Sequence, residues 1–177
     1  MTRFLLTTAL VLPTVAFAAG GGSSNPPTQT NTTTTCKNGQ VWSQSMQKCV
    51  NPQSGSLQDD ELYQAAREFA YAGQHENTLN VLGEMSDPQD DRVLTYKGFS
   101  HRKMGDAALG NAYYRQAIAK NPDNLLARSY MGQGFVEAGD FVGAREQLLQ
   151  IRARGGQGTW AETALLQAIE TGTGYSY

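Results

Sequence analysis

A repeat of 34 residues constrains this 177-residue chain more than any other feature. The pair Gly105-Asp106 recurs as Gly139-Asp140, and an earlier glycine, Gly73, precedes Gly105 by 32 residues. Self-similarity at this period is typical of two-helix units that bury their apolar faces only against neighbouring units. The positions that align around the two pairs are Gly98 with Gly132, His101 with Phe135, Gly110 with Ala144, Tyr114 with Leu148 and Ala117 with Ile151. We therefore expect stacked helical units over most of the chain.

The glycines and aspartates of the repeat indicate where one helix ends and the next begins. Gly73, Gly105 and Gly139 suit the left-handed conformation that often follows the end of a helix. Asp106 and Asp140 come directly after two of these glycines, where a carboxylate can accept free backbone N–H groups of the next helix. Each unit is thus expected to be a helix, a tight turn and a second helix.

Other local signals set further helix ends. Pro122 is expected to stop a helix, because proline cannot donate a backbone hydrogen bond. Ser56 with Asp59 resembles a capping box that opens the first helix. Small residues are expected where paired helices cross closely, at Gly98, Gly110, Gly132 and Ala144. The seven helices predicted are 57–72, 75–85, 90–104, 106–120, 124–138, 140–154 and 159–171.

This pattern resembles the tetratricopeptide repeat, a unit of 34 residues with two helices. In the middle copy the family's marked positions fall on Leu94, Lys97, Gly98, His101, Gly105, Gly110, Tyr114, Ala117 and Pro122. In the next copy they fall on Arg128, Met131, Gly132, Phe135, Gly139, Ala144, Leu148 and Ile151. The resemblance covers residues 57–171 and implies an all-α solenoid of about three units. The last predicted helix would then cap the apolar face of the third unit.

The chain before the repeats divides into three segments. Residues 1–18 have a positive start at Arg3, an apolar stretch and the small-x-small ending Ala16-Phe17-Ala18, which together predict a cleaved signal peptide. Residues 19–35 are rich in Gly, Ser, Asn, Pro and Thr, and we expect a disordered tether there. Residues 36–50 hold both cysteines. A short tail, 172–177, follows the repeats.

An even cysteine count behind a signal peptide predicts a disulfide between Cys36 and Cys49. The bridged hairpin is expected to have almost no core of its own and to lie outside the repeats, so that its reduction leaves the helices nearly unchanged. Trp42 has two interpretations, as the plug of this hairpin or as a stacking platform for a sugar or peptide.

The sequence carries no recognisable catalytic set. Neither histidine, His75 or His101, has catalytic partners at a known spacing, and no Gly-x-Ser-x-Gly, phosphate-loop or metal-ligand motif occurs. We therefore expect no enzyme activity, no cofactor and no metal. A net charge of −2 also argues against a nucleic-acid partner.

The resemblance implies a binding groove lined by the first helix of each unit. Transferred position by position, the groove residues are Tyr63, Arg67, Tyr71, Thr95, Phe99, Arg102, Lys103, Ser129, Gln133 and Glu137. Arg67 and Arg102 would make the groove locally positive and favour a partner segment with carboxylates. The alternative interpretation of Tyr71 and Phe99 is that they only pack between helices.

The expected function is that of an exported scaffold or adaptor that binds a peptide segment of an envelope protein in this groove. The alternative is a cell-wall glycan-associated protein that binds through the Cys36–Cys49 hairpin. The expected location is the periplasm, with the extracellular space as the alternative and no membrane anchor after signal cleavage.

Overall fold

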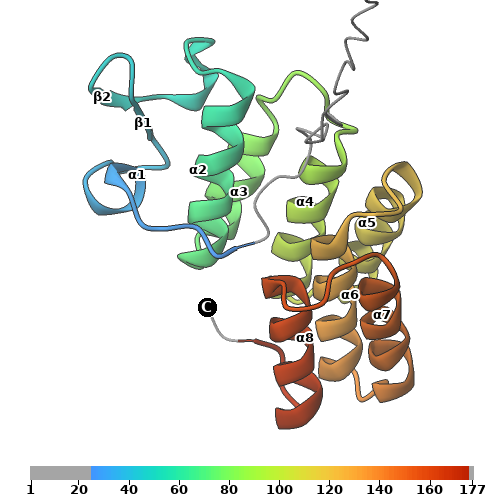
Figure 1. Cartoon of the computed structure of the whole chain (residues 1–177). Helices are drawn as coiled ribbons and strands as arrows, with labels where there is room; N and C mark the ends of the chain where they lie inside the picture. Colours follow the sequence, from blue (N-terminus) through green and yellow to red (C-terminus); the bar gives the residue numbers. More distant parts are fainter. Residues whose placement is uncertain (1–24, 176–177) are drawn as a thin grey trace, which may run out of the picture.

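The computed structural model describes residues 25–175, so the predicted signal peptide, residues 19–24 and residues 176–177 lie outside the described part. The described residues are mostly helical, with one small two-stranded sheet (Figure 1). The elements are α1 Asn31–Thr34, β1 Val41–Ser43, β2 Lys48–Val50, a 3-10 turn Pro52–Ser54, α2 Asp59–Tyr71, α3 His75–Leu82, α4 Asp91–Lys103, α5 Ala107–Lys120, α6 Leu125–Glu137, α7 Phe141–Ala153 and α8 Trp160–Thr171. All seven helices predicted from the sequence are present, with ends shifted by at most three residues.

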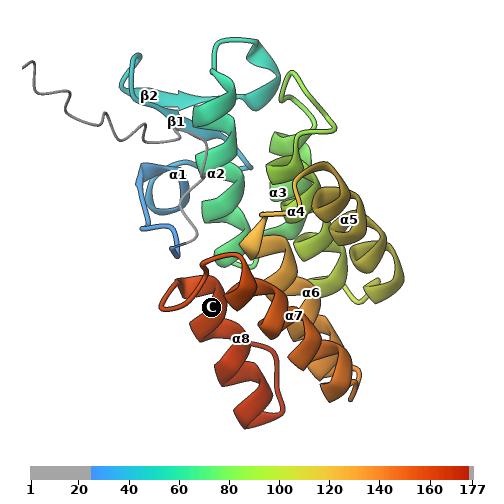
Figure 2. The ribbon, with the colours of Figure 1, turned by 45° about the vertical axis from the view of Figure 1, so that its right-hand side comes forward.

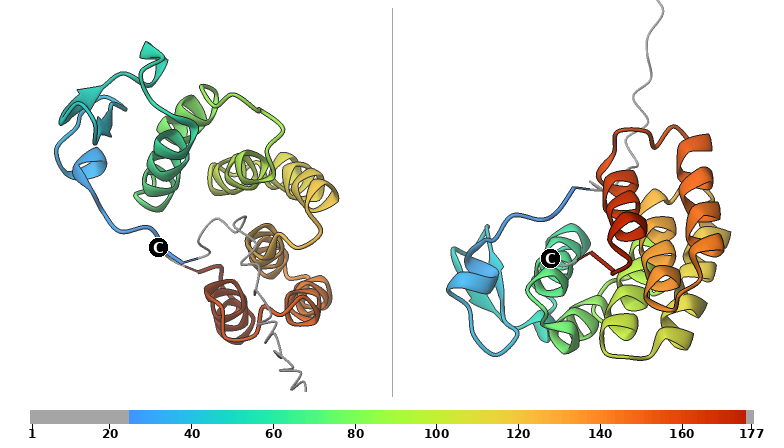
Figure 3. Two further views of the ribbon diagram at one scale, coloured as in Figure 1. Left: turned by 45° about the horizontal axis from the view of Figure 1, so that its top comes forward. Right: turned by 90° about the horizontal axis from the view of Figure 1, so that it is seen from below.

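The helices pack as consecutive pairs, α2 with α3, α4 with α5 and α6 with α7. The first helices of successive pairs also contact one another, α2 with α4 and α4 with α6, and α8 continues this row against α6. Two further views show the pairs following a curved path, with α4, α6 and α8 on its inner side and α5 and α7 outside (Figures 2 and 3). We call the surface formed by α2, α4, α6 and α8 on this inner side the inner face.

The turns inside the pairs have the chemistry that the repeat predicts. Gly73, Gly105 and Gly139 adopt φ angles of 73°, 95° and 77°, which a residue with a side chain rarely adopts. The carboxylates of Asp106 and Asp140 accept hydrogen bonds of 3.0 and 2.8 Å from the backbone N–H three residues further on. Two residues per turn thus both end one helix and begin the next.

Small residues allow the helices to cross closely where the sequence predicts it. A Cβ atom added at Gly110 would lie 2.8 Å from the carbonyl oxygen of Gly98 on α4. A Cβ at Gly132 on α6 would meet the side chain of Leu165 on α8 at 2.7 Å. Leu165 is fully buried. The last helix therefore covers the third pair, as its apolar spacing predicts.

The beginning of α2 differs from the expected capping box. Gln58, not Ser56, is the N-cap residue, and its box partner is Glu61. The backbone N–H of Gln58 donates to Glu61 Oε2 at 3.2 Å, whereas Ser56 Oγ pairs with Ser54 Oγ at 2.6 Å. The helix starts two residues later than predicted, and its capping box uses Gln58 and Glu61 in place of Ser56 and Asp59.

The segment predicted as a flexible tether is ordered from residue 25 onward, which corrects that expectation for residues 25–35. Glu68 on α2 is buried, and its carboxylate accepts four hydrogen bonds from this segment. Thr30 donates through its N–H at 2.7 Å and its hydroxyl at 2.6 Å, and Thr33 donates through the same two groups. The prediction of a flexible tether rested on the lack of apolar residues to bury. A low apolar content does not reveal that hydrogen bonds to a buried carboxylate can order the segment.

The predicted disulfide joins Cys36, which follows α1, to Cys49 on β2, the strand that pairs antiparallel with β1. The hairpin does not stand apart from the helices, however. Val41 and Val50 are buried in the same apolar cluster as residues of α2 and α3. A Cβ added at Gly39 would lie 2.6 Å from Asn77 Oδ1 on α3. The hairpin and α1 thus cover the first helix pair, contrary to the expectation of an independent segment.

Candidate functional site

Most of the predicted groove residues lie on the inner face, but few of them are open to solvent. The buried ones are Tyr63, Arg67, Thr95, Phe99, Arg102, Ser129 and Gln133. Tyr71 and Lys103 are half-buried, and Glu137 is exposed. The expectation that Arg67 and Arg102 project freely into a groove is therefore wrong, and both guanidinium groups have structural partners.

Tyrosine hydroxyls join the helices of the inner face into one network. The hydroxyl of Tyr71 on α2 lies 2.8 Å from that of Tyr130 on α6, and Trp160 Nε1 on α8 donates to Tyr71 at 3.3 Å. The hydroxyl of Tyr96 on α4 lies 3.5 Å from that of Tyr130. Burial raises the pKa of Tyr71 and of Tyr96, so both phenols stay protonated.

Sequence reasoning did not select Tyr96, Tyr130 or Trp160 as site residues. Tyr96 and Tyr130 nevertheless occupy the same position of the 34-residue repeat. That coincidence was the available signal for the first two. Trp160 lies outside the repeat register, and only the docking of α8 brings it to Tyr71.

Arg67 holds the N-terminal segment against α2. Its Nε donates to Tyr96 at 3.3 Å and its Nη1 to Gln64 Oε1 at 2.8 Å. Its Nη2 donates to the backbone carbonyl of Asn25. Arg67 therefore binds the main chain of the non-helical segment that lies beside α2.

Arg102 ties α4 to α5 and α6. Its Nη1 lies 2.6 Å from Glu137 Oε2, its Nε donates to Tyr114 at 3.4 Å, and its guanidinium sits over the ring of Phe99. Its side chain is only 2% exposed. Burial lowers the pKa of Arg102, but neighbouring Tyr114 and Glu137 outweigh it and raise this pKa above its usual range. The Arg102 guanidinium therefore makes its contacts with residues of the helices themselves.

The segment after α8 also lies on the inner face. Lys103 Nζ donates to the backbone carbonyl of Tyr175 at 3.4 Å. The Tyr175 ring packs edge-on against Trp160, with 4.8 Å between ring centroids. Gly174 lies against the carboxylate of Glu137, with which an added Cβ would collide. Two non-helical parts of the chain, one near each end of the described residues, thus rest on inner-face side chains.

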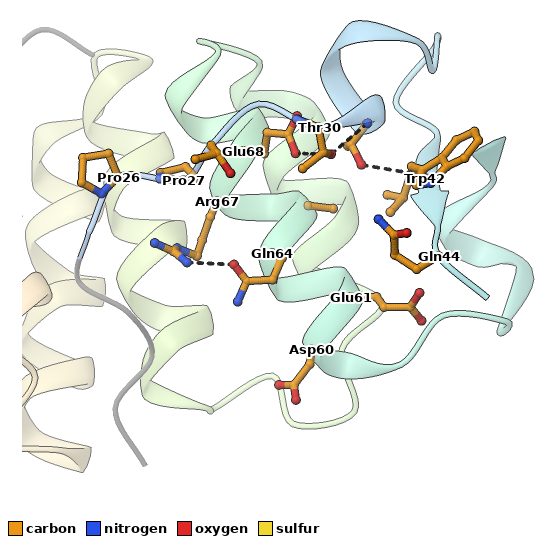
Figure 4. Close-up of a pocket in the computed structure, with 14 residues that line it drawn as sticks. Pro26, Pro27, Thr30, Trp42, Gln44, Asp60, Glu61, Gln64, Arg67 and Glu68 are labelled. Carbon is orange, nitrogen blue, oxygen red and sulfur yellow. Dashed lines mark hydrogen bonds between the residues drawn. The ribbon is translucent and has the colours of Figure 1, made fainter. Parts of the chain in front are cut away.

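A pocket of about 520 Å³ lies between α2, the hairpin and the N-terminal segment. Pro26 and Pro27 stand beside Arg67 at one end, and Gln44 faces α2 from the hairpin at the other (Figure 4). Asp60, Glu61 and Gln64 line the α2 side. The indole of Trp42 points away from α2 in this view.

Within residues 25–175, no group of three or more His, Cys, Asp or Glu side chains is placed to hold a metal ion. None of the helices in this part of the chain combines the length and the apolar character needed to cross a membrane. A comparison with known proteins finds no matching family model, no similar curated protein and no similar solved structure.

Proposed function

We propose that this protein is an exported scaffold whose helix pairs form a tetratricopeptide-like solenoid and whose inner face binds a peptide segment of an envelope partner. One observation carries the proposal. Inner-face cations already hold non-helical chain by its backbone carbonyls, Arg67 at Asn25 and Lys103 at Tyr175. Backbone contacts of this kind are open to many sequences, and aromatic neighbours add apolar contact area.

Two features support export. Residues 1–18 have the composition of a signal peptide, and the Cys36–Cys49 disulfide fits an oxidising compartment. The periplasm is the compartment we propose. The proposal includes no catalytic step, cofactor or metal.

The proposed groove is tested on a half-buried residue, because replacing buried Arg67 or Arg102 would damage the fold. Peptides are selected from a random display library against the chain that begins at Ala19, and their affinities are measured. Lys103→Glu should weaken the selected peptides by at least about tenfold, which corresponds to about 1.4 kcal/mol. Lys97→Glu, on the same helix, is the matched control and should bind normally.

Equal affinity of the selected peptides for Lys103→Glu, with an unchanged melting temperature, would contradict peptide binding at the inner face. So would a selection that yields no peptide with measurable affinity. A drop for both lysine variants would point to a general charge effect and would also count against the proposed groove.

A second candidate function is glycan binding, and the pocket beside the hairpin favours it. Amides of Gln44 and Gln64 and the carboxylate of Glu61 line this pocket, and such groups can exchange hydrogen bonds with sugar hydroxyls. The chain from Ala19 should then co-sediment with purified wall polymer, and Gln64→Ala should reduce the bound fraction more than Gln116→Ala on exposed α5 surface. No co-sedimentation would exclude this candidate.

A further inference from the structure

The contacts of the segment after α8 suggest what the inner face selects. Resting on the function proposed above, we propose that the inner face recognises a glycine followed by an aromatic residue, and that Gly174-Tyr175 is a tethered ligand that competes with such a partner segment. Each part of this dipeptide meets a separate group of the inner face.

The glycine requirement comes from Glu137. A Cβ at position 174 would overlap the Glu137 carboxylate, and two cations hold this end of a flexible side chain in place. It is held by Arg102 Nη1 at 2.6 Å and by Lys103 Nζ at 3.6 Å. Any larger residue at this place would have to displace this carboxylate and so disturb its ion pairs, one of them to a buried guanidinium, which is costly.

The aromatic requirement comes from Trp160. The rings of Tyr175 and Trp160 meet at 82°, the edge-to-face geometry that aromatic pairs favour. Trp160 is itself fixed, because its Nε1 donates to Tyr71 within the hydroxyl network. A partner ring would thus meet a preformed surface.

The backbone contact fixes the direction of the segment. Lys103 Nζ donates a hydrogen bond to the carbonyl oxygen of Tyr175, the residue that follows the glycine. Lys103 also lies 5.9 Å from the centre of the Phe99 ring. One lysine therefore connects the carbonyl of the bound segment, the Glu137 carboxylate and the aromatic floor of the inner face.

The tether makes the segment a competitor. Only Gly172 and Thr173 separate the end of α8 from Gly174, and Gly172 makes the turn with a φ of 72°. Short linkers give effective concentrations in the millimolar range. If a free Gly-Tyr segment binds the inner face with a Kd of about 0.1 mM, the tethered Gly174-Tyr175 would weaken a partner's apparent affinity by about tenfold.

The experiment uses fluorescein-labelled Thr-Gly-Thr-Gly-Tyr-Ser-Tyr, the sequence of residues 171–177, and fluorescence anisotropy. The chain from Ala19 is compared with its Gly174→Ala and Tyr175→Ala variants, in which the tethered ligand is disabled and the inner face is intact. Both variants should bind the probe at least about fivefold more tightly than the unchanged chain does. Thr173→Ala, an exposed position in the same segment, is the control and should not differ from the unchanged chain.

A second probe in which alanine replaces the glycine before the first tyrosine should bind the Gly174→Ala chain at least about tenfold more weakly. Equal binding of the two probes would overturn the glycine requirement. Equal binding of the first probe to all chains, or no binding to any, would overturn the competition. Concentration-dependent dimers of the unchanged chain that are absent in Tyr175→Ala would show that the segment binds the inner face of a second copy. That result would overturn the proposed competition within one chain.

These outcomes are separable from those for the proposed function. Selected library peptides that lack a glycine–aromatic pair but bind in a Lys103-dependent way would support peptide binding at the inner face. They would contradict only the proposed glycine–aromatic specificity. Failure of both probes together with failure of the library would remove both.

Discussion

The two ends of the helix array are closed in different ways. At the C-terminal end, α8 lays apolar side chains such as the fully buried Leu165 over α6 and α7. At the N-terminal end, a disulfide hairpin and the short helix α1 cover α2 and α3, with Glu68 accepting four hydrogen bonds from threonines. A helical array can thus be finished by an extra amphipathic helix or by a short stapled segment with polar contacts.

The difference matters because a stacked unit leaves one face uncovered at each end. An amphipathic helix buries enough apolar surface to hold itself in place. The N-terminal segment is poor in apolar residues, so it relies on a covalent link and on a charged acceptor. We therefore expect the two ends to fail under different perturbations.

The largest effect should come from the apolar end. Leu165→Ala removes a fully buried side chain that fills the space above Gly132. We expect a loss of about 2–5 kcal/mol in the free energy of unfolding, since buried Leu→Ala changes leave cavities. Urea unfolding followed by circular dichroism measures it.

Leu149→Ala on α7 is the matched control, because that side chain is 58% exposed. It should change stability by no more than about 0.5 kcal/mol. Similar losses for both variants would show that α8 does not close the array through Leu165.

A smaller effect is expected at the polar end. Glu68→Gln keeps the size of the side chain but leaves a single acceptor oxygen for donors from Thr30 and Thr33. Loss of buried charge-assisted hydrogen bonds in such a change should lower the free energy of unfolding by about 1–3 kcal/mol. The melting temperature should fall, while Glu84→Gln at an exposed position should not lower it. An unchanged Glu68→Gln protein would mean that the threonine contacts do not hold the segment.

The smallest effect concerns pH and the first helix pair. Burial, together with nearby Lys103 and Arg102, lowers the pKa of His75 at the start of α3. Because the unfolded chain keeps the ordinary histidine pKa of about 6.5, it binds the proton at a higher pH than the folded chain does. The neutral His75 therefore contributes its full share of the free energy of unfolding above about pH 6.5, and this contribution is lost as the pH falls below that value. Lowering the pH from about 7.5 to about 5.5 should lower the melting temperature more in the wild type than in His75→Gln. The melting temperatures of the two proteins at both pH values decide it; an identical decrease in both would exclude a His75 contribution.

Sequence features within one repeat predicted the fold well, and contacts between distant segments explain what they missed. Gly105 and Asp106 act on neighbouring residues, so their spacing was sufficient to place a turn and a cap. The contacts of Glu68 with Thr30 and Thr33 span 35 to 38 residues and follow no repeat. The predicted groove residues lie on α2, α4 and α6, and most of them are buried, not exposed as expected. Arg67 and Arg102 are held by Tyr96 and Glu137, which lie on other helices, so no local sequence pattern indicates these contacts.

The central claim is that the cysteine-bridged segment is the N-terminal end of the helix array and not an appendage. Amide hydrogen exchange by mass spectrometry, compared before and after reduction of Cys36–Cys49, tests it directly. A bridge that closes a loop of this size contributes about 3 kcal/mol, so reduction should loosen the hairpin and uncover α2. We predict faster exchange across residues 36–50 and also across α2 and α3, with α6, α7 and α8 unchanged. Faster exchange confined to residues 36–50 would contradict the claim.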